Sequence, residues 1–261
     1  MDDLQDIVDV GLHPIDDLDT YARKCKDELQ KNSILVLRNF LRPEALEKLQ
    51  LESNALQDKA FFSTQNHNVL LTKKNKEWND DHPCNLEVVS NKGCVPHDLI
   101  PENSCLKSLY TSKYFQRFLQ AVLSLNDIHP YADTLSSINY NYYQEKQQLG
   151  WHFDNASFAV SLMIQSPESG GKFEYLTDVR CVEKNKLNTP KIEAVLKDRI
   201  KADELELEEG TLVLFYGNNY LHRVTPVTSK KSRILATLNY NLEKSIKLSE
   251  NARLTFFGRL N

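Results

Sequence analysis

The feature that most constrains the fold is a series of short apolar segments in the second half of the chain. The segments read LSSINYNYY, FAVSLMIQ, GKFEYL, TLVLFYG and RILATLNYN. Turn signals separate them, such as Pro167, Gly170-Gly171 and Gly217-Asn218. Among these segments the one comparably strong helical pattern is KIEAVLKDRI, at 191–200. Strands that follow one another without a helix between them predict a β-sandwich or barrel.

The first half of the chain is predicted to be mainly helical and to support this β core. Apolar residues recur at three- and four-residue steps after Pro43 and again at 105–125, and 15–31 also looks helical. Segment 33–41 reads as a strand, whereas 63–104 is polar, contains several prolines and lacks a period, which indicates a long lid or binding loop.

We therefore predict one α+β domain over the 261 residues. Its expected parts are 1–134 (helical support and the lid or loop region), 135–243 (the β core, with a helical insert at 178–205) and 244–261 (a C-terminal segment).

Composition narrows the class of function. Hydrophobic residues make up 41% and charged residues 26%, as in ordinary soluble proteins, and the net charge of −4 with no basic stripe argues against a nucleic-acid partner. The N-terminal residues do not resemble a signal peptide, and no apolar run approaches the roughly 20 residues of a membrane span. The five cysteines are scattered without CxxC spacing. We expect free thiols and a cytoplasmic location, with no membrane partner.

Three residues in the β half could bind one metal ion. His152 and Asp154 are two apart at the head of an apolar run, so on a strand their side chains would point the same way. His222 follows Asp154 by 68 residues, just after another predicted strand. Two histidines and one carboxylate on one face of a metal form the facial triad of non-haem iron(II) oxygenases, although the same ligands also suit zinc.

Arg233 follows His222 by 11 residues and opens the predicted strand RILATLNYN. An arginine at that position could form a bidentate pair with the carboxylate of a bound ligand. The alternative is a surface arginine beside Lys230 and Lys231.

Together these residues resemble a known family. His152-Phe153-Asp154, His222 and Arg233 match the HxD…H…R pattern of the iron(II)/2-oxoglutarate-dependent oxygenases, in the same order along the chain. WHFDNASFAVSLMIQSPESGGKFEYL, EEGTLVLFYGNNYLHRVTPV and FFGR look like the subgroup of free-amino-acid hydroxylases and radical halogenases. The resemblance covers about 137–242 and implies a double-stranded β-helix, a cupin-like jelly roll, with supporting N-terminal helices.

The resemblance also implies an activity. It predicts iron(II) on His152, Asp154 and His222, with 2-oxoglutarate as cosubstrate paired to Arg233 and oxygen as the oxidant. The halogenases of the subgroup carry a small residue where this chain has Asp154, and the missing carboxylate leaves room for chloride. The presence of Asp154 therefore implies a dioxygenase that hydroxylates an unactivated C–H bond, most naturally of a free amino acid. Desaturation or another oxidation is the alternative outcome.

Further residues are predicted to contact the small molecules. Those expected to help hold 2-oxoglutarate are Asn141, Tyr143 and Thr225. Those expected near the substrate are Asn155, Thr237, Asn239, His82 and His97. For each of these residues a structural role, in a strand, in a turn or on the surface, is the alternative.

Other functions are compatible with parts of the pattern. One is a zinc or cupin-like enzyme that uses the same triad without 2-oxoglutarate, but it has no need of Arg233. Another is a jelly roll that only binds a small molecule, which an intact triad disfavours. Within the family, the alternative substrate is a side chain of a protein or a nucleic acid. The sequence does not identify the amino acid or the carbon.

Overall fold

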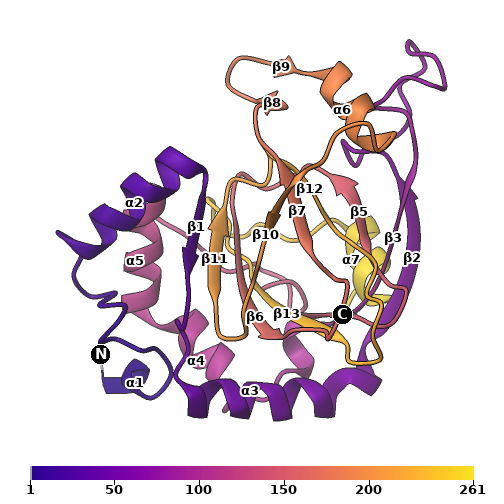
Figure 1. Ribbon diagram of the computed structural model, residues 1–261. Coiled ribbons are helices and arrows are strands. Elements are labelled where there is room, and N and C mark those ends of the chain that lie inside the picture. The colour runs from indigo at the N-terminus through magenta and orange to yellow at the C-terminus, as the bar shows by residue number, and fades with distance from the viewer. Residues whose placement is uncertain (1) are drawn as a thin grey trace.

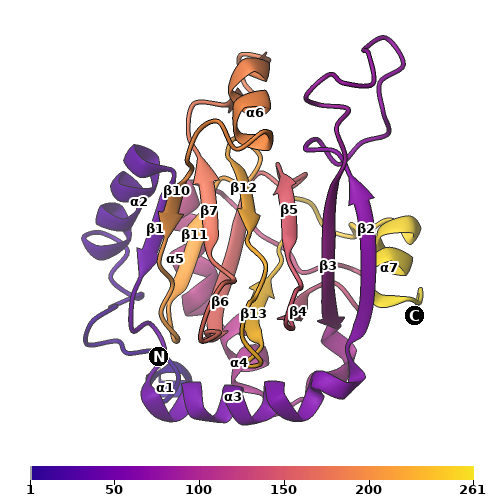
Figure 2. The ribbon, with the colours of Figure 1, turned by 45° about the vertical axis from the view of Figure 1, so that its right-hand side comes forward.

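The structure is a computed structural model that describes residues 2–261, and two antiparallel sheets form its centre (Figures 1 and 2). The larger sheet has the order β1-β11-β6-β13-β4-β3-β2. Its strands are β1 (Ile34–Leu37), β2 (Phe61–His67), β3 (Val88–Val95), β4 (Ile138–Tyr143), β6 (Ala159–Gln165), β11 (Leu212–Phe215) and β13 (Arg233–Leu238). Segments from both ends of the chain therefore share this sheet.

The smaller sheet faces the larger one and has the order β10-β7-β12-β5. Its strands are β5 (Leu149–His152), β7 (Phe173–Leu176), β10 (Asp203–Leu205) and β12 (Leu221–Val224), and a separate ribbon is made of β8 (Arg180–Cys181) and β9 (Lys186–Leu187). From β4 to β7, and again from β10 to β13, successive strands along the chain alternate between the two sheets. This α+β arrangement is the predicted double-stranded β-helix core.

Helices cover the outer face of the larger sheet. They are α1 (Asp2–Gln5), α2 (Tyr21–Asn32), α3 (Pro43–Leu56), α4 (Cys105–Thr111) and α5 (Lys113–Leu123), with short 3-10 turns at Gln57–Lys59 and His97–Leu99. On the opposite side α6 (Thr189–Leu196) stands above the smaller sheet, and α7 (Glu250–Phe257) packs against β2 and β3 (Figure 2). None of the helices in 2–261 has the length and apolarity needed to span a membrane.

Strand alternation separates the core from the pocket. On β4, Ile138, Tyr140 and Tyr142 point to the helices and join the main apolar cluster. The hydroxyl group of Tyr140 donates to Glu52 Oε1 at 2.7 Å, which satisfies a buried polar group on that face. Asn141 points inward and lines the space between the two sheets. The larger sheet thus has an apolar outer face and an inner face free to carry polar groups.

The helical layer should be essential for stability. Phe115 of α5 is fully buried and contacts Phe40, with ring centres 6.0 Å apart. Phe115→Ala removes most of a buried aromatic ring and leaves a cavity, so we expect about 3–5 kcal/mol less free energy of unfolding. Urea denaturation followed by circular dichroism measures this change. Tyr114→Ala, at the adjacent exposed position, is the matched control and should change stability little. An equal loss in both variants would contradict this packing.

Two sequence expectations about secondary structure were wrong. The segment 63–104 is not one long loop, because β2 and β3 occupy much of it and only 68–87 connects them. These strands escaped notice because their inward residues are polar and line the pocket, for example Gln65 and Lys92. The predicted helix 105–125 is two helices, separated at Ser112, whose backbone is extended and whose side chain caps α5.

Candidate metal centre and pocket

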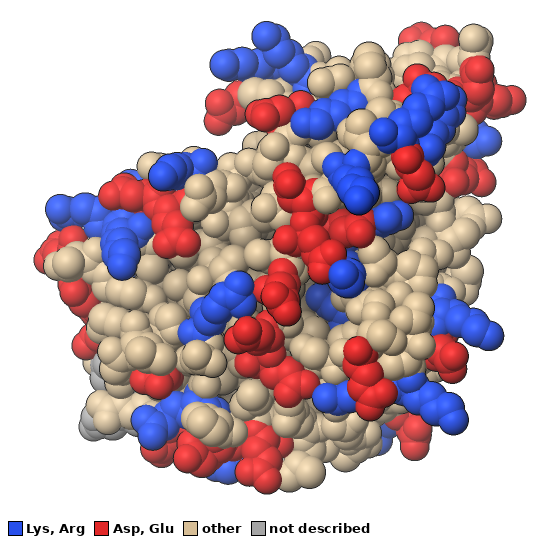
Figure 3. All heavy atoms as spheres, viewed as in Figure 1, with Lys and Arg blue, Asp and Glu red and all other residues tan. Residues whose placement is uncertain are grey.

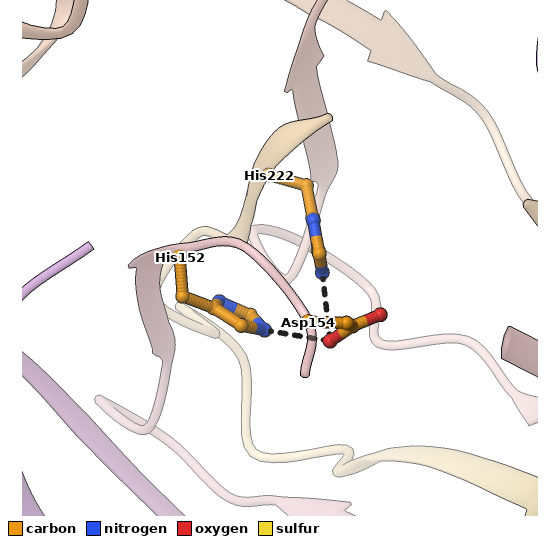
Figure 4. A group of neighbouring side chains, drawn as sticks. All are labelled: His152, Asp154 and His222. Carbon is orange, nitrogen blue, oxygen red and sulfur yellow. Dashed lines mark ion pairs between the residues drawn. The ribbon is translucent and has the colours of Figure 1, made fainter. Parts of the chain in front are cut away.

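Cross-strand pairing brings the two histidines together. His152 ends β5, His222 lies on β12, and the two residues are direct partners in the smaller sheet, with ring centres 4.2 Å apart. Asp154 follows β5 by two residues, and its backbone N–H donates to the carbonyl oxygen of Gly217 at 3.0 Å. Its Oδ1 lies 3.4 Å from His152 Nε2 and 3.6 Å from His222 Nε2 (Figure 4). All three potential ligand atoms lie within 4.8 Å of one another.

Backbone carbonyl groups fix the orientation of both imidazole rings. His152 Nδ1 lies 2.8 Å from the carbonyl oxygen of Gly150, and His222 Nδ1 lies 2.9 Å from that of Tyr220. With the proton on Nδ1, each ring turns the lone pair of Nε2 toward Asp154 (Figure 4). This is how metal-binding histidines are usually held.

The protonation states also suit a metal. Burial lowers the pKa of His152, which keeps its imidazole neutral. Burial alone would raise the pKa of Asp154, but the adjacent His222 and His152 rings outweigh it and hold that pKa well below its usual range. A neutral imidazole and an ionised carboxylate are the forms that coordinate a cation. The donor set therefore fits iron(II) in a facial triad.

The triad opens on a cavity of about 380 Å³ between the two sheets. At this size the cavity can hold small organic molecules with most of their surface buried. It is lined by residues of both sheets and by Leu248 and Phe256 from the C-terminal segment.

Arg233 reaches this cavity from the first position of β13. It pairs with Tyr143 across the sheet, its guanidinium carbon lies 5.4 Å from the centre of the Tyr143 ring, and it is only 1% exposed. Nη1 is buried and has no hydrogen-bond partner among the described residues. Burial lowers the pKa of Arg233, but a guanidinium remains charged at neutral pH. A buried cation with unused donors is suited to a ligand carboxylate, such as that of 2-oxoglutarate.

The other predicted contact residues divide into two groups. Five of them line the cavity together with the triad and Arg233, and they are Asn141, Tyr143, Asn155, Thr237 and Asn239.

The remaining three are outside the cavity lining. Thr225 Oγ1 accepts a hydrogen bond from the backbone of Lys172, and His82 stacks on Trp78 in the connection between β2 and β3. His97 starts a 3-10 turn, with its ring 6.4 Å from the centre of the Tyr110 ring.

The sequence reasoning missed several lining residues on β2 and β3, among them His67 and Lys92. The one local signal is that Ser63, Gln65 and His67 alternate along one face of β2, but alternation of polar residues does not by itself indicate a strand. His67 Nε2 lies 2.5 Å from Ser90 Oγ, which in turn accepts the backbone N–H of Gly150 at 2.9 Å. These contacts join β2 and β3 to the strand that carries His152.

Gly217 is the residue that leaves room for the Asp154 carboxylate. A Cβ atom at this position would lie 1.9 Å from Asp154 Oδ2. We expect Gly217→Ala to push the carboxylate away from the histidines and to weaken iron(II) binding about 10–100-fold, the range seen when the support of a metal ligand is lost. Anaerobic titration with iron(II) measures the effect. Gly11→Ala, where the new atom would meet Asp9 at 3.3 Å in an exposed turn, is the control. Unchanged affinity in Gly217→Ala would contradict the role given to Asp154.

Comparison with known proteins agrees with this geometry. Residues 18–254 match the family model described as halogenase D. Among curated proteins, none matches the chain in sequence.

Solved structures share the fold at low sequence identity. The carbocyclase SnoK from nogalamycin biosynthesis has a TM-score of 0.59 at 9% identity, covering 94% of this chain and 95% of its own. A 2OG-Fe(II) oxygenase family oxidoreductase from Burkholderia pseudomallei has a TM-score of 0.55 at 12% identity, covering 88% and 94%. The epimerase SnoN, solved with Fe³⁺, alpha ketoglutarate and nogalamycin RO, has a TM-score of 0.53 at 7% identity, covering 84% and 82%.

Proposed function

This chain belongs to the halogenase D family of iron(II)/2-oxoglutarate oxygenases, and from that premise we propose that it hydroxylates a C–H bond of a free amino acid. Hydroxylation is supported by the position of the Asp154 carboxylate, whose Oδ1 lies 3.4 Å from His152 Nε2 and 3.6 Å from His222 Nε2. When iron(II) is bound, a carboxylate ligand at this position would take the coordination site that a halide needs. Hydroxylation is therefore favoured over the halogenation that the family name suggests.

Each part of the pocket has a task in this reaction. His152, Asp154 and His222 would hold iron(II), and Arg233 would fix the distal carboxylate of 2-oxoglutarate. When bound, iron(II) and 2-oxoglutarate supply the oxidising chemistry, in which oxygen is consumed and succinate is formed. The apolar walls exclude water, and the lining amides orient the substrate so that one C–H bond faces the metal.

A small substrate fits the observed cavity better than a macromolecule does. The two histidines of the triad are buried between the two sheets, and 2-oxoglutarate must share the 380 Å³ cavity with the substrate. Acidic and basic side chains are interspersed over the face in Figure 3, where acidic groups gather near the middle and no broad basic patch is visible. Such a surface does not favour a nucleic acid.

The direct test is a screen of free amino acids with iron(II), 2-oxoglutarate and oxygen. We expect one class of amino acid to gain one oxygen atom by mass spectrometry, with a matching amount of succinate. Steady substrate-independent succinate formation with no modified amino acid would argue against this substrate class. Absence of succinate under all conditions would argue against the oxygenase itself.

Arg233 gives a separate test of the cosubstrate site. A charge-assisted bidentate contact contributes about 1.5–3 kcal/mol, so Arg233→Ala should raise the 2-oxoglutarate concentration needed for half-maximal rate about ten- to a hundredfold. The amino-acid requirement should change less. Arg199→Ala removes an exposed arginine and serves as the control, and thermal melts check that both variants are folded. If the 2-oxoglutarate dependence of Arg233→Ala equals that of the wild type, Arg233 does not bind the cosubstrate.

A further inference from the structure

More basic than acidic side chains line the cavity, and this excess limits which substrates can bind. Asp154 is the one acidic residue among the described residues of the lining, and it is committed to the two histidines. Two cations line the same cavity, Arg233 and Lys92. Arg233 is accounted for by 2-oxoglutarate. Lys92 remains without a role in the proposed reaction.

Lys92 is held at the cavity by neutral groups. Its Nζ donates to Asn141 Oδ1 at 2.6 Å and lies 5.6 Å from the centre of the Phe256 ring. Asn141 is 3% exposed, and its Nδ2 lies 3.4 Å from Thr237 Oγ1, which turns its Oδ1 toward the lysine. Among the described residues no acidic side chain forms an ion pair with Lys92. An ammonium group positioned in this way has hydrogen-bond donors left for an anion.

Asn239, which also lines the cavity, offers a hydrogen-bond acceptor. Asn239 Nδ2 donates to the carbonyl oxygen of Ser136 at 2.7 Å and to Asn139 Oδ1 at 3.1 Å. Asn239 Oδ1 is therefore the atom of this amide left to a ligand in the cavity. Lys92 and Asn239 are linked through Asn141 and Thr237, because Asn141 Nδ2 and Asn239 Nδ2 each lie 3.4 Å from Thr237 Oγ1. Together they offer a cation for a carboxylate and a neutral oxygen for an ammonium group, the two polar groups of a free amino acid.

Among the described lining residues, no acidic side chain besides Asp154 is available to a second cation on the substrate. Apolar side chains near the triad include Phe173 and Phe215, whose ring centres lie 5.6 and 5.0 Å from that of His222. A charged side chain buried beside them without an acidic partner would lose its hydration with nothing to replace it. Resting on the proposed function, we infer that the substrate is an amino acid with an uncharged, mainly apolar side chain, whose carboxylate pairs with Lys92. Amino acids with cationic side chains are excluded by the lack of an acidic partner.

Norleucine and lysine provide a matched pair for this inference. Both have a straight side chain, but only lysine ends in a charged group, and pentylamine is norleucine without its carboxylate. Each is titrated by calorimetry, without oxygen, into the protein loaded with iron(II) and 2-oxoglutarate. We expect norleucine to bind at least about tenfold more tightly than lysine or pentylamine, the effect of one well-placed charge-assisted contact or one unpaired charge. Tighter binding of lysine would overturn the inference.

Variants at Lys92 test the carboxylate contact. Lys92→Met should weaken norleucine about ten- to a hundredfold and remove the preference over pentylamine, because the anion then has no cationic partner. Lys92→Arg should keep most of that preference, and Lys244→Met, at an exposed position, should keep all of it. If Lys92→Met weakens 2-oxoglutarate instead and leaves norleucine unchanged, the lysine serves the cosubstrate and the inference fails.

The same experiments separate this inference from the proposed function. Should lysine or ornithine bind most tightly and gain an oxygen atom, the hydroxylase function holds and the inference about the side chain is wrong. Should no free amino acid bind the loaded protein or gain oxygen, while 2-oxoglutarate still binds, the amino-acid function itself is wrong and the inference falls with it.

Discussion

His222→Ala is expected to abolish succinate formation while the protein stays folded. The side chain supplies one of two imidazole ligands, and the imidazole that remains, His152, is paired with it across β5 and β12. Loss of a group that merely supports a metal ligand costs about 10–100-fold in affinity, and loss of the ligand itself should cost more than that. His222 is buried at the edge of the cavity, so its replacement by alanine enlarges the cavity there and leaves the surrounding strands in place.

Iron(II) titration under nitrogen and an assay of succinate from 2-oxoglutarate measure the two consequences separately. His129→Ala is the matched control, since His129 lies outside the cavity and its Nε2 pairs with Asp127 at 3.6 Å. Its iron affinity and turnover should equal those of the wild type. Full activity of His222→Ala would mean that the triad is not the metal site, and the proposed function would fail with it.

The triad could be predicted from the sequence because the spacing of His152 and Asp154 is local and the order of the three ligands along the chain follows the family pattern. His152 and Asp154 are two residues apart, and strand geometry alone turns their side chains the same way. The direct pairing of His152 with His222 is a long-range register that no local pattern contains. Resemblance to a family supplied that partner.

The wall formed by β2 and β3 could not be predicted in the same way. Strands are recognised by apolar alternation, but the inward side chains of β2, such as Ser63 and Gln65, face a ligand cavity and are polar. A Cβ atom at Gly93 of β3 would lie 2.5 Å from the Phe62 ring, so a side chain there would require that ring to move. The role of Lys92 depends on this wall, so it became visible only once the strands were placed.

His82 and His97 were predicted as substrate contacts, but the structure places them outside the cavity lining. His82 and His97 were plausible substrate contacts only if segment 63–104 folded over the cavity as a lid. Instead, two strands bring this region into the larger sheet, and His82 stacks on Trp78 with ring centres 4.2 Å apart. Their involvement with substrate stays a prediction. Thr237 lies on β13 and Asn239 directly follows it, and both line the cavity, as does Asn155 in the turn after β5.

The carboxylate of Asp154 should decide whether the reaction ends in hydroxylation or in halogenation. Asp154→Gly removes the carboxylate, and Gly217 already leaves the space beside it without a side chain. We expect turnover to fall by more than about a hundredfold, since the one anionic ligand that faces both histidines is lost. The position that opens at the metal can admit chloride, so traces of chlorinated amino acid are the most that this variant should form.

The test supplies the identified amino acid, iron(II), 2-oxoglutarate and oxygen, with and without a high concentration of chloride. Products are resolved by mass spectrometry for the wild type and for Asp154→Gly. The wild type should give only the product with one added oxygen in both conditions, because the carboxylate keeps chloride from the metal. Efficient chlorination by Asp154→Gly would show that the surrounding pocket already positions the substrate for halogen transfer. Chlorinated product from the unmodified protein would overturn the hydroxylase proposal, since Asp154 could then not be the group that excludes the halide.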